Sequence, residues 1–152
     1  MQLPILALAL AAPLVSALGM ARVVNNCSDS VHVWSVGAEV TGPYQLGKNG
    51  GFYGEEFVKD AVTGGRALKV TRHADGLYTG AAQTIFAYNL DHASVWYDLS
   101  DVFGDAFAGK KVVVASAEAT CPSIVWPTGV PPAGSQVKVC TASKNVVLTL
   151  CA

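Results

Sequence analysis

Short runs rich in β-branched and aromatic residues recur along this chain, and clusters of turn-forming residues separate them. In the run TIFAYNL the side chains alternate, so that one face of an extended strand carries Thr84, Phe86, Tyr88 and Leu90. No window of about 12 residues keeps the spacing of an amphipathic helix. The sequence therefore predicts an all-β domain, an antiparallel sandwich or barrel. The expected strands cover residues 21–25, 31–36, 51–57, 68–72, 84–90, 95–99, 111–117, 136–140 and 145–151.

The N-terminal stretch has no charged side chain and a continuous apolar centre from Leu3 to Leu14. Val15-Ser16-Ala17 fits the small-residue cleavage pattern, which predicts a secretory signal peptide over residues 1–17 and one domain over residues 18–152. Cleavage after Ala21 is the competing choice. The apolar run is shorter than the roughly 20 residues that span a bilayer, so we expect no membrane insertion. We expect a secreted protein, extracellular or associated with the cell wall.

The charge balance argues against several classes of partner. The net charge is −1 and 14% of the residues are charged, so we expect no nucleic-acid partner and no binding to anionic lipid. A surface of this kind suits a neutral partner such as polysaccharide, although an ordinary solvated surface explains it more simply. Four cysteines in a secreted chain predict two disulfides, and they leave three pairings open. Their spacing gives no metal site, and we expect no cofactor.

The stretch SVWYDLSDVFGDAF, residues 94–107, holds three aspartates: Asp98, Asp101 and Asp105. Hydrolysis of a glycosidic bond usually needs two carboxylates held about 5 to 9.5 Å apart. The simpler explanation places Asp98 on a strand, Asp101 in a turn that it stabilises itself, and Asp105 in solvent. We therefore expect no catalytic residue. Asp98 and Asp101 stay as candidates for ligand binding.

Aromatic residues are the other candidates for a ligand site. Trp126 lies among prolines between Cys121 and Cys140, where its ring can either stack on a sugar or fill the space under the loop. A glucan-binding patch would combine Trp126 with Tyr53, Tyr44 and Phe52. Asn26-Cys27-Ser28 is formally an N-glycosylation sequon, but the cysteine in its middle, with the disulfide expected there, argues against modification.

Three segments carry a family resemblance when they are read in order. They are ARVVNNCSDSVHVWSVG, then TIFAYNL with VWYDLSDVFGDAF, and finally NVVLTLCA. This order is similar to that of thaumatin-like proteins, and it resembles most closely a small fungal branch, the Blastomyces yeast-phase-specific protein family of antigenic thaumatin-like proteins. The resemblance implies a thaumatin-like antiparallel β-sandwich, with a short disulfide-closed loop in place of the second domain. It also implies that the first cysteine pairs with the last, which gives Cys27–Cys151 and Cys121–Cys140.

The resemblance also bears on function. Thaumatin-like proteins that bind or cut β-1,3-glucan have an acidic cleft, and its positions fall here on Ala87, Val95, Asp98 and the neighbourhood of Phe103. One of these positions keeps its carboxylate, Asp98. The resemblance thus implies a secreted, non-enzymatic fungal protein at the cell wall or in the host space, with wall polysaccharide such as β-glucan as a partner. The alternatives are an effector or antigen with a host protein target, and a weak β-1,3-glucan hydrolase.

Overall fold

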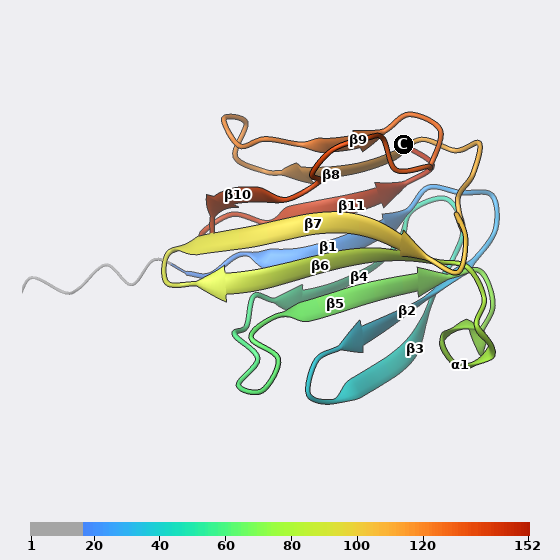
Figure 1. Cartoon of the computed structure of the whole chain (residues 1–152), viewed down its shortest axis with the longest axis horizontal. Helices are drawn as coiled ribbons and strands as arrows, with labels where there is room; N and C mark the ends of the chain where they lie inside the picture. Colours follow the sequence, from blue (N-terminus) through green and yellow to red (C-terminus); the bar gives the residue numbers. More distant parts are fainter. Residues whose placement is uncertain (1–16) are drawn as a thin grey trace, which may run out of the picture.

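Two β-sheets packed face to face form the fold in the computed structural model, which describes residues 17–152 (Figure 1). The predicted signal peptide lies outside the described residues, apart from Ala17, and stays a prediction. Sheet A has five strands in the order β4 (Gly51–Glu56), β1 (Met20–Asn25), β11 (Val146–Leu150), β8 (Val112–Ser116) and β9 (Ile124–Trp126). Sheet B has six strands in the order β10 (Lys138–Thr141), β7 (Ser94–Val102), β6 (Gln83–Asp91), β5 (Arg66–Thr71), β2 (Val31–Val36) and β3 (Val40–Leu46).

The core lies between the sheets because every second side chain of the central strands is apolar. On β6, Thr84, Phe86 and Tyr88 are buried while Leu90 is partly buried, so the predicted inner face is confirmed. Sheet A contributes Val23 from β1 among its buried residues. The all-β sandwich is therefore the fold that the sequence predicts.

Two edge strands were not predicted. β3 contains Gly42 and Pro43, which weaken a strand signal, but an edge strand tolerates proline because one side of its backbone needs no partner. β9 is only three residues long and lies inside the segment expected to be a loop. The one described helix, α1 (Gly76–Thr79), is a single short turn. In residues 17–152 no helix has the length and apolar character needed to cross a membrane.

The first and last strands are neighbours in sheet A. β1 pairs with β11 in parallel and with β4 in antiparallel orientation, so β1 is held from both sides. This parallel pair departs from the antiparallel pairing of the other strands. Neither strand's own sequence indicates it, since the pairing joins the two ends of the domain.

Both disulfides have the pairing that the family resemblance implies. Cys27–Cys151 follows the ends of β1 and β11, with a Cα–Cα distance of 5.1 Å across a sequence separation of 124. Cys121–Cys140 spans 19 positions and closes the segment that contains β9. The shorter disulfide therefore encloses a strand of sheet A as well as a loop.

The start of β1 bears on where a signal peptide would be cleaved. Gly19 donates its N–H to the carbonyl of Ala142, and its own carbonyl accepts the N–H of Phe57. Ala21 is fully buried between its partners on β4 and β11. Cleavage after Ala21 would remove these contacts, and the cleavage site itself stays a prediction.

Candidate functional site

The outer face of sheet B carries an exposed tryptophan beside a partly buried aspartate. Trp96 and Asp98 are two residues apart on β7, and Tyr97 between them points into the core, so both lie on the outer face. Trp96 is 46% exposed. A shallow pocket of about 170 Å³ is lined by Ala87, Asn89, Trp96, Asp98 and Val137, together with Tyr88 and Tyr97. We call this set of residues the Trp96 groove.

Two further depressions adjoin the Trp96 groove. Toward the β6–β7 turn, a second depression is lined by Lys59, Asn89, Asp91 and Trp96. Across the strands, a third depression shares Ala87 and Tyr88 with the groove and reaches β5 and β2. Neighbouring strands lie about 4.8 Å apart, so the depressions from β7 to β2 extend over roughly 14 Å. This face can therefore accommodate an extended ligand that crosses the strands.

The carboxylate of Asp98 is partly withdrawn from solvent. One of its carboxylate oxygens is buried and has no hydrogen-bond partner among residues 17–152. Burial raises the pKa of Asp98, because the charged form loses solvation. Across the strand pair Asp98 faces Ala87, so the position where a second carboxylate would be needed is occupied by an alanine. The lining of the Trp96 groove therefore combines apolar side chains with a single carboxylate, that of Asp98.

Asp101 lies on the other side of the sheet. Strand β7 continues to Val102, so Asp101 has the orientation of Leu99 and faces Thr84, which is fully buried. The expectation of a turn at Asp101 is therefore wrong, and Asp98 and Asp101 cannot act on one ligand. Burial raises the pKa of Asp101 to about 7, and the neighbouring Asp105 carboxyl adds to the rise.

The raised pKa of Asp101 gives the protein a specific pH dependence. Between about pH 4, where an unfolded aspartate titrates, and pH 7 the folded state holds the proton more tightly, so stability falls as pH rises. We expect Asp101→Asn to remove this slope and to raise the free energy of unfolding at pH 8 by about 1 to 2 kcal/mol, since solvent screens a partly exposed group. Thermal melts from pH 4 to pH 8 measure it.

The matched control for that measurement is Asp105→Asn, which removes the neighbouring carboxyl and keeps Asp101. It should recover only part of the slope, because burial of Asp101 is the larger cause of its raised pKa. Equal slopes in the wild-type protein and Asp101→Asn would contradict the assignment.

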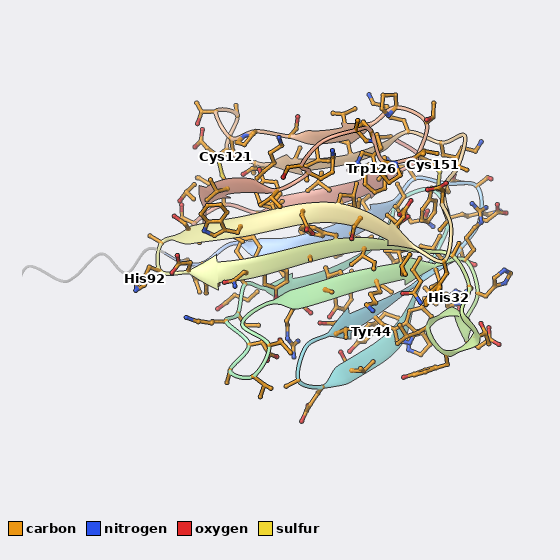
Figure 2. All side chains as sticks on the ribbon, in the orientation of Figure 1. His32, Tyr44, His92, Cys121, Trp126 and Cys151 are labelled. Atoms are coloured by element: carbon orange, nitrogen blue, oxygen red, sulfur yellow. A yellow bond between two sulfur atoms is a disulfide. The ribbon has the colours of Figure 1, made fainter. Side chains whose placement is uncertain are left out.

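The position of Trp126 corrects the expectation of an exposed aromatic patch. Its side chain is fully buried on β9, and its indole Nε1 donates to the side-chain oxygen of Gln136 at 3.1 Å. Nearby, the Tyr97 hydroxyl donates to the carbonyl of Pro122 and anchors the same segment to sheet B. Of the two placements open for Trp126, the structure therefore has the ring filling the space under the loop. In the view of Figure 2, Trp126 lies among the strands in the upper part of the sandwich, between Cys121 and Cys151.

Tyr53 also lies away from a shared aromatic patch. It is on β4, at the opposite edge of sheet A from β9, and its ring stacks on Tyr44 with centroids 4.7 Å apart. Phe52 points to the outer face of sheet A under the guanidinium of Arg22. The patch expected from Trp126, Tyr53, Tyr44 and Phe52 is therefore not formed.

A polar network that the sequence did not reveal holds Tyr53 in place. Glu55 accepts hydrogen bonds from Tyr53 at 2.8 Å and Tyr88 at 2.5 Å, and lies 3.8 Å from Arg66. Burial, with the bonds to Glu55, raises the pKa of both tyrosines. Every partner is supplied from within the domain, so we assign this network to the closure of the sandwich edge between β4 and sheet B.

Trp96 is the residue of this site that the sequence analysis did not select. The alternation in VWYDLS identifies its face, because Val95, Tyr97 and Leu99 are buried, which turns Trp96 and Asp98 outward. Within residues 17–152, no group of three or more histidine, cysteine or acidic side chains is arranged to hold a metal ion.

Three comparisons with known proteins give results that agree with one another. The family model described as Blastomyces yeast-phase-specific protein matches residues 8–152. The antigenic thaumatin-like protein of Arthroderma benhamiae is 31% identical over 114 residues, which cover 74% of this chain and 56% of that relative. The chain thus spans little more than half of that relative's length. The crystal structure of the protein elicitor MoHrip2 from Magnaporthe oryzae matches 88% of this chain and 99% of its own, with 27% identity and a TM-score of 0.71.

Proposed function

The chain belongs to the Blastomyces yeast-phase-specific protein family, and from this premise we propose that it is a secreted, non-enzymatic fungal protein that binds cell-wall polysaccharide such as β-glucan through the Trp96 groove. The observation that carries the proposal is Trp96, an indole that stands 46% exposed on a strand whose neighbouring side chains are buried. Tryptophan is mostly buried in soluble domains, so an exposed one in a shallow pocket favours a contact surface.

The composition of the groove supports a neutral ligand. Trp96 and Val137 supply apolar surface, while Asn89 and Asp98 supply hydrogen-bonding groups at its side. The apolar face of a sugar ring stacks on an indole, and its hydroxyls need polar partners at the rim. The protein's net charge of −1 provides no strong electrostatic attraction. These features together favour an uncharged polysaccharide over a charged one.

The same face supports binding without hydrolysis. Among the described residues that line the Trp96 groove, the single carboxylate is Asp98. The next acidic residue on this face, Asp91, lies four positions along β6 from Ala87, which faces Asp98. At a rise of about 3.3 Å per residue, the backbone positions of Ala87 and Asp91 are roughly 13 Å apart along β6. That separation exceeds the range of about 5 to 9.5 Å that glycoside hydrolysis uses.

The test is sedimentation of the purified protein with insoluble β-1,3-glucan, chitin and mannan. We expect Trp96→Ala to weaken binding about tenfold, since loss of one stacked ring removes about 1 to 2 kcal/mol. Binding should change little between low salt and about 0.5 M salt, because screening acts only on charges. No reducing sugar should appear above that released by boiled protein.

Tyr78→Ala is the matched control, because Tyr78 is 75% exposed on α1, outside the groove. It should bind like the wild-type protein. Retention of binding by Trp96→Ala would refute the site. Release of reducing sugar that Asp98→Asn abolishes would establish the alternative, a weak β-1,3-glucan hydrolase.

A second candidate function is that of an effector or antigen that contacts a host protein. Val137 and Val139 lie exposed on or beside the edge strand β10 and adjoin Trp96, which extends the apolar surface to the sheet edge. The names of the relatives, an antigenic protein and a protein elicitor, also favour it. If the protein binds none of the three polysaccharides, contact with a host protein replaces polysaccharide binding as the proposed function.

A further inference from the structure

We infer that Asn26 is an N-glycosylation site, and that its glycan projects from the end of the sandwich opposite to the Trp96 groove. The inference rests on the secretion that is part of the proposed function. Asn26-Cys27-Ser28 is the one segment of the chain in which an asparagine is followed, two positions later, by serine or threonine. The middle residue is not proline, so the segment satisfies the acceptor pattern.

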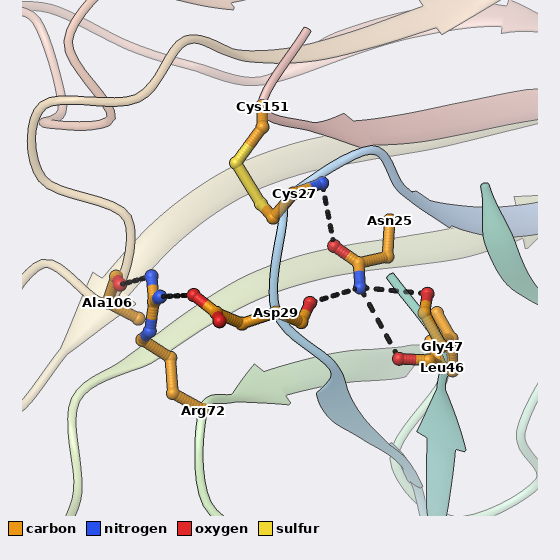
Figure 3. Close-up of a disulfide and its surroundings, with 8 residues drawn as sticks. All are labelled: Asn25, Cys27, Asp29, Leu46, Gly47, Arg72, Ala106 and Cys151. Carbon is orange, nitrogen blue, oxygen red and sulfur yellow. Dashed lines mark hydrogen bonds and ion pairs between the residues drawn. A yellow bond between two sulfur atoms is a disulfide. The ribbon is translucent and has the colours of Figure 1, made fainter. Parts of the chain in front are cut away.

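The structure gives the two adjacent asparagines different roles. Asn25 is fully buried, and its amide nitrogen donates to the carbonyls of Asp29 and Gly47 at 2.8 and 3.1 Å, while its oxygen accepts the N–H of Cys27 (Figure 3). Asn26 is exposed and uses its backbone N–H, which donates to the carbonyl of Leu150 at 3.1 Å. A sugar on the Asn26 side chain would therefore break no hydrogen bond of the described residues.

The disulfide at Cys27 does not block the reaction, because it forms later. The partner, Cys151, follows 124 positions downstream, and the next cysteine in the chain, Cys121, follows 94 positions downstream. At about 5 to 20 residues per second, synthesis of 124 residues takes roughly 6 to 25 s. During that interval the thiol of Cys27 is without its partner and the acceptor segment is unfolded. Asn26 is thus accessible before the disulfide closes.

The chemical step needs an oligosaccharide carried on a lipid diphosphate. The amide nitrogen of Asn26 attacks the anomeric carbon of the first sugar, the bond from this carbon to the phosphate oxygen breaks, and the lipid diphosphate leaves. The amide nitrogen loses one proton, and the side chain stays uncharged. The modification therefore leaves the net charge of the protein unchanged.

The folded protein has room for the product. Beside Asn26 lies a pocket of about 200 Å³ whose lining includes Asp29, Arg72 and Lys110. The Asp29 carboxylate lies 3.1 Å from the Arg72 guanidinium, and the polar side chains of this pocket can bind sugar hydroxyls. A glycan also covers this polar surface without burying apolar side chains.

The position of the site keeps the glycan away from the Trp96 groove. Figure 2 shows His92 at one end of the sandwich and Cys151 toward the other. Strand β7 starts just after the His92 turn, which places Trp96 near that end, whereas Asn26 is adjacent to Cys27 and its disulfide partner. The glycan and the proposed binding face therefore do not compete for space.

Translation of the full chain in the presence of fungal microsomes tests the inference. Protection from added protease reports entry into the vesicles, and a slower band that endoglycosidase H collapses reports the glycan. We expect the wild-type chain to be protected and to shift. Asn26→Gln and Ser28→Ala should be protected without a shift, while the control Asn49→Gln should shift like the wild-type chain.

A protected wild-type chain without a shift would overturn the glycosylation and leave secretion intact. An unprotected chain would overturn both. A shift that occurs only in Cys151→Ser would also overturn the inference for the natural chain, because it would mean that the disulfide closes before the sugar is transferred.

Discussion

Replacing Cys27 and Cys151 together by serine should lower the free energy of unfolding by about 4 to 5 kcal/mol. This disulfide closes a loop of 124 positions, and the entropy that a cross-link removes from the unfolded chain grows with loop length. A domain of this size has a total stability of roughly 5 to 15 kcal/mol, so the variant should be close to unfolding. Urea unfolding followed by tryptophan fluorescence should show a midpoint lower by about 2 M.

The second disulfide provides the internal control. Replacing Cys121 and Cys140 by serine opens a segment with a separation of only 19, for which the expected loss is about 3 kcal/mol. Both double variants leave no free thiol at either pair, which excludes disulfide exchange. A Cys27/Cys151 variant that unfolds at the wild-type midpoint, or later than the Cys121/Cys140 variant, would contradict the prediction.

Trp126→Ala should destabilise the protein by about 3 to 5 kcal/mol without direct loss of a ligand contact. The ring is fully buried, so its removal leaves a cavity under the 127–137 segment and an unpaired side-chain oxygen on Gln136. Chemical denaturation measures the loss of stability. Polysaccharide binding below the unfolding transition should be close to that of the wild-type protein, because Trp126 does not line the Trp96 groove.

Trp126→Phe separates the two contributions of this side chain. It keeps most of the buried apolar volume and removes the hydrogen bond to Gln136, so a smaller loss of about 1 to 2 kcal/mol is expected. A Trp126→Ala protein with wild-type stability and impaired binding would contradict the buried placement of the ring.

Most of the fold could be predicted because the central strands have a clear alternation. Phe86 and Tyr88, for example, were assigned to one face and are both buried. The edge strand β3 could not be predicted, because Gly42 and Pro43 interrupt its pattern, and its edge position that tolerates them is a property of the whole sheet. The parallel contact of β1 with β11 is likewise invisible locally, because it joins segments more than a hundred residues apart.

The candidate site was predicted only in part. Asp98 was selected from the sequence and does line the Trp96 groove, but Asp101 was grouped with it because strand β7 was expected to end before it. Strand β7 continues for three residues beyond its expected end, so the alternation of the strand turns the Asp101 side chain to the face opposite to Asp98. The neighbouring prolines left two placements open for Trp126, stacking on a sugar or filling the space under the loop, and Trp96 was not selected at all. Burial depends on which sheet covers each ring, and that is a tertiary property.

The parallel course of β1 and β11 has a practical consequence for how the protein can be attached to a surface. Because both strands run in the same direction, the described chain starts and finishes at opposite ends of the sandwich (Figure 1). Ala17 and Leu18 line a depression together with His92, at the end where β7 and the Trp96 groove begin. A support or fusion partner joined before Leu18 would sit beside that groove and hinder large ligands. One joined after Ala152 would present the groove outward, toward a particle of wall material.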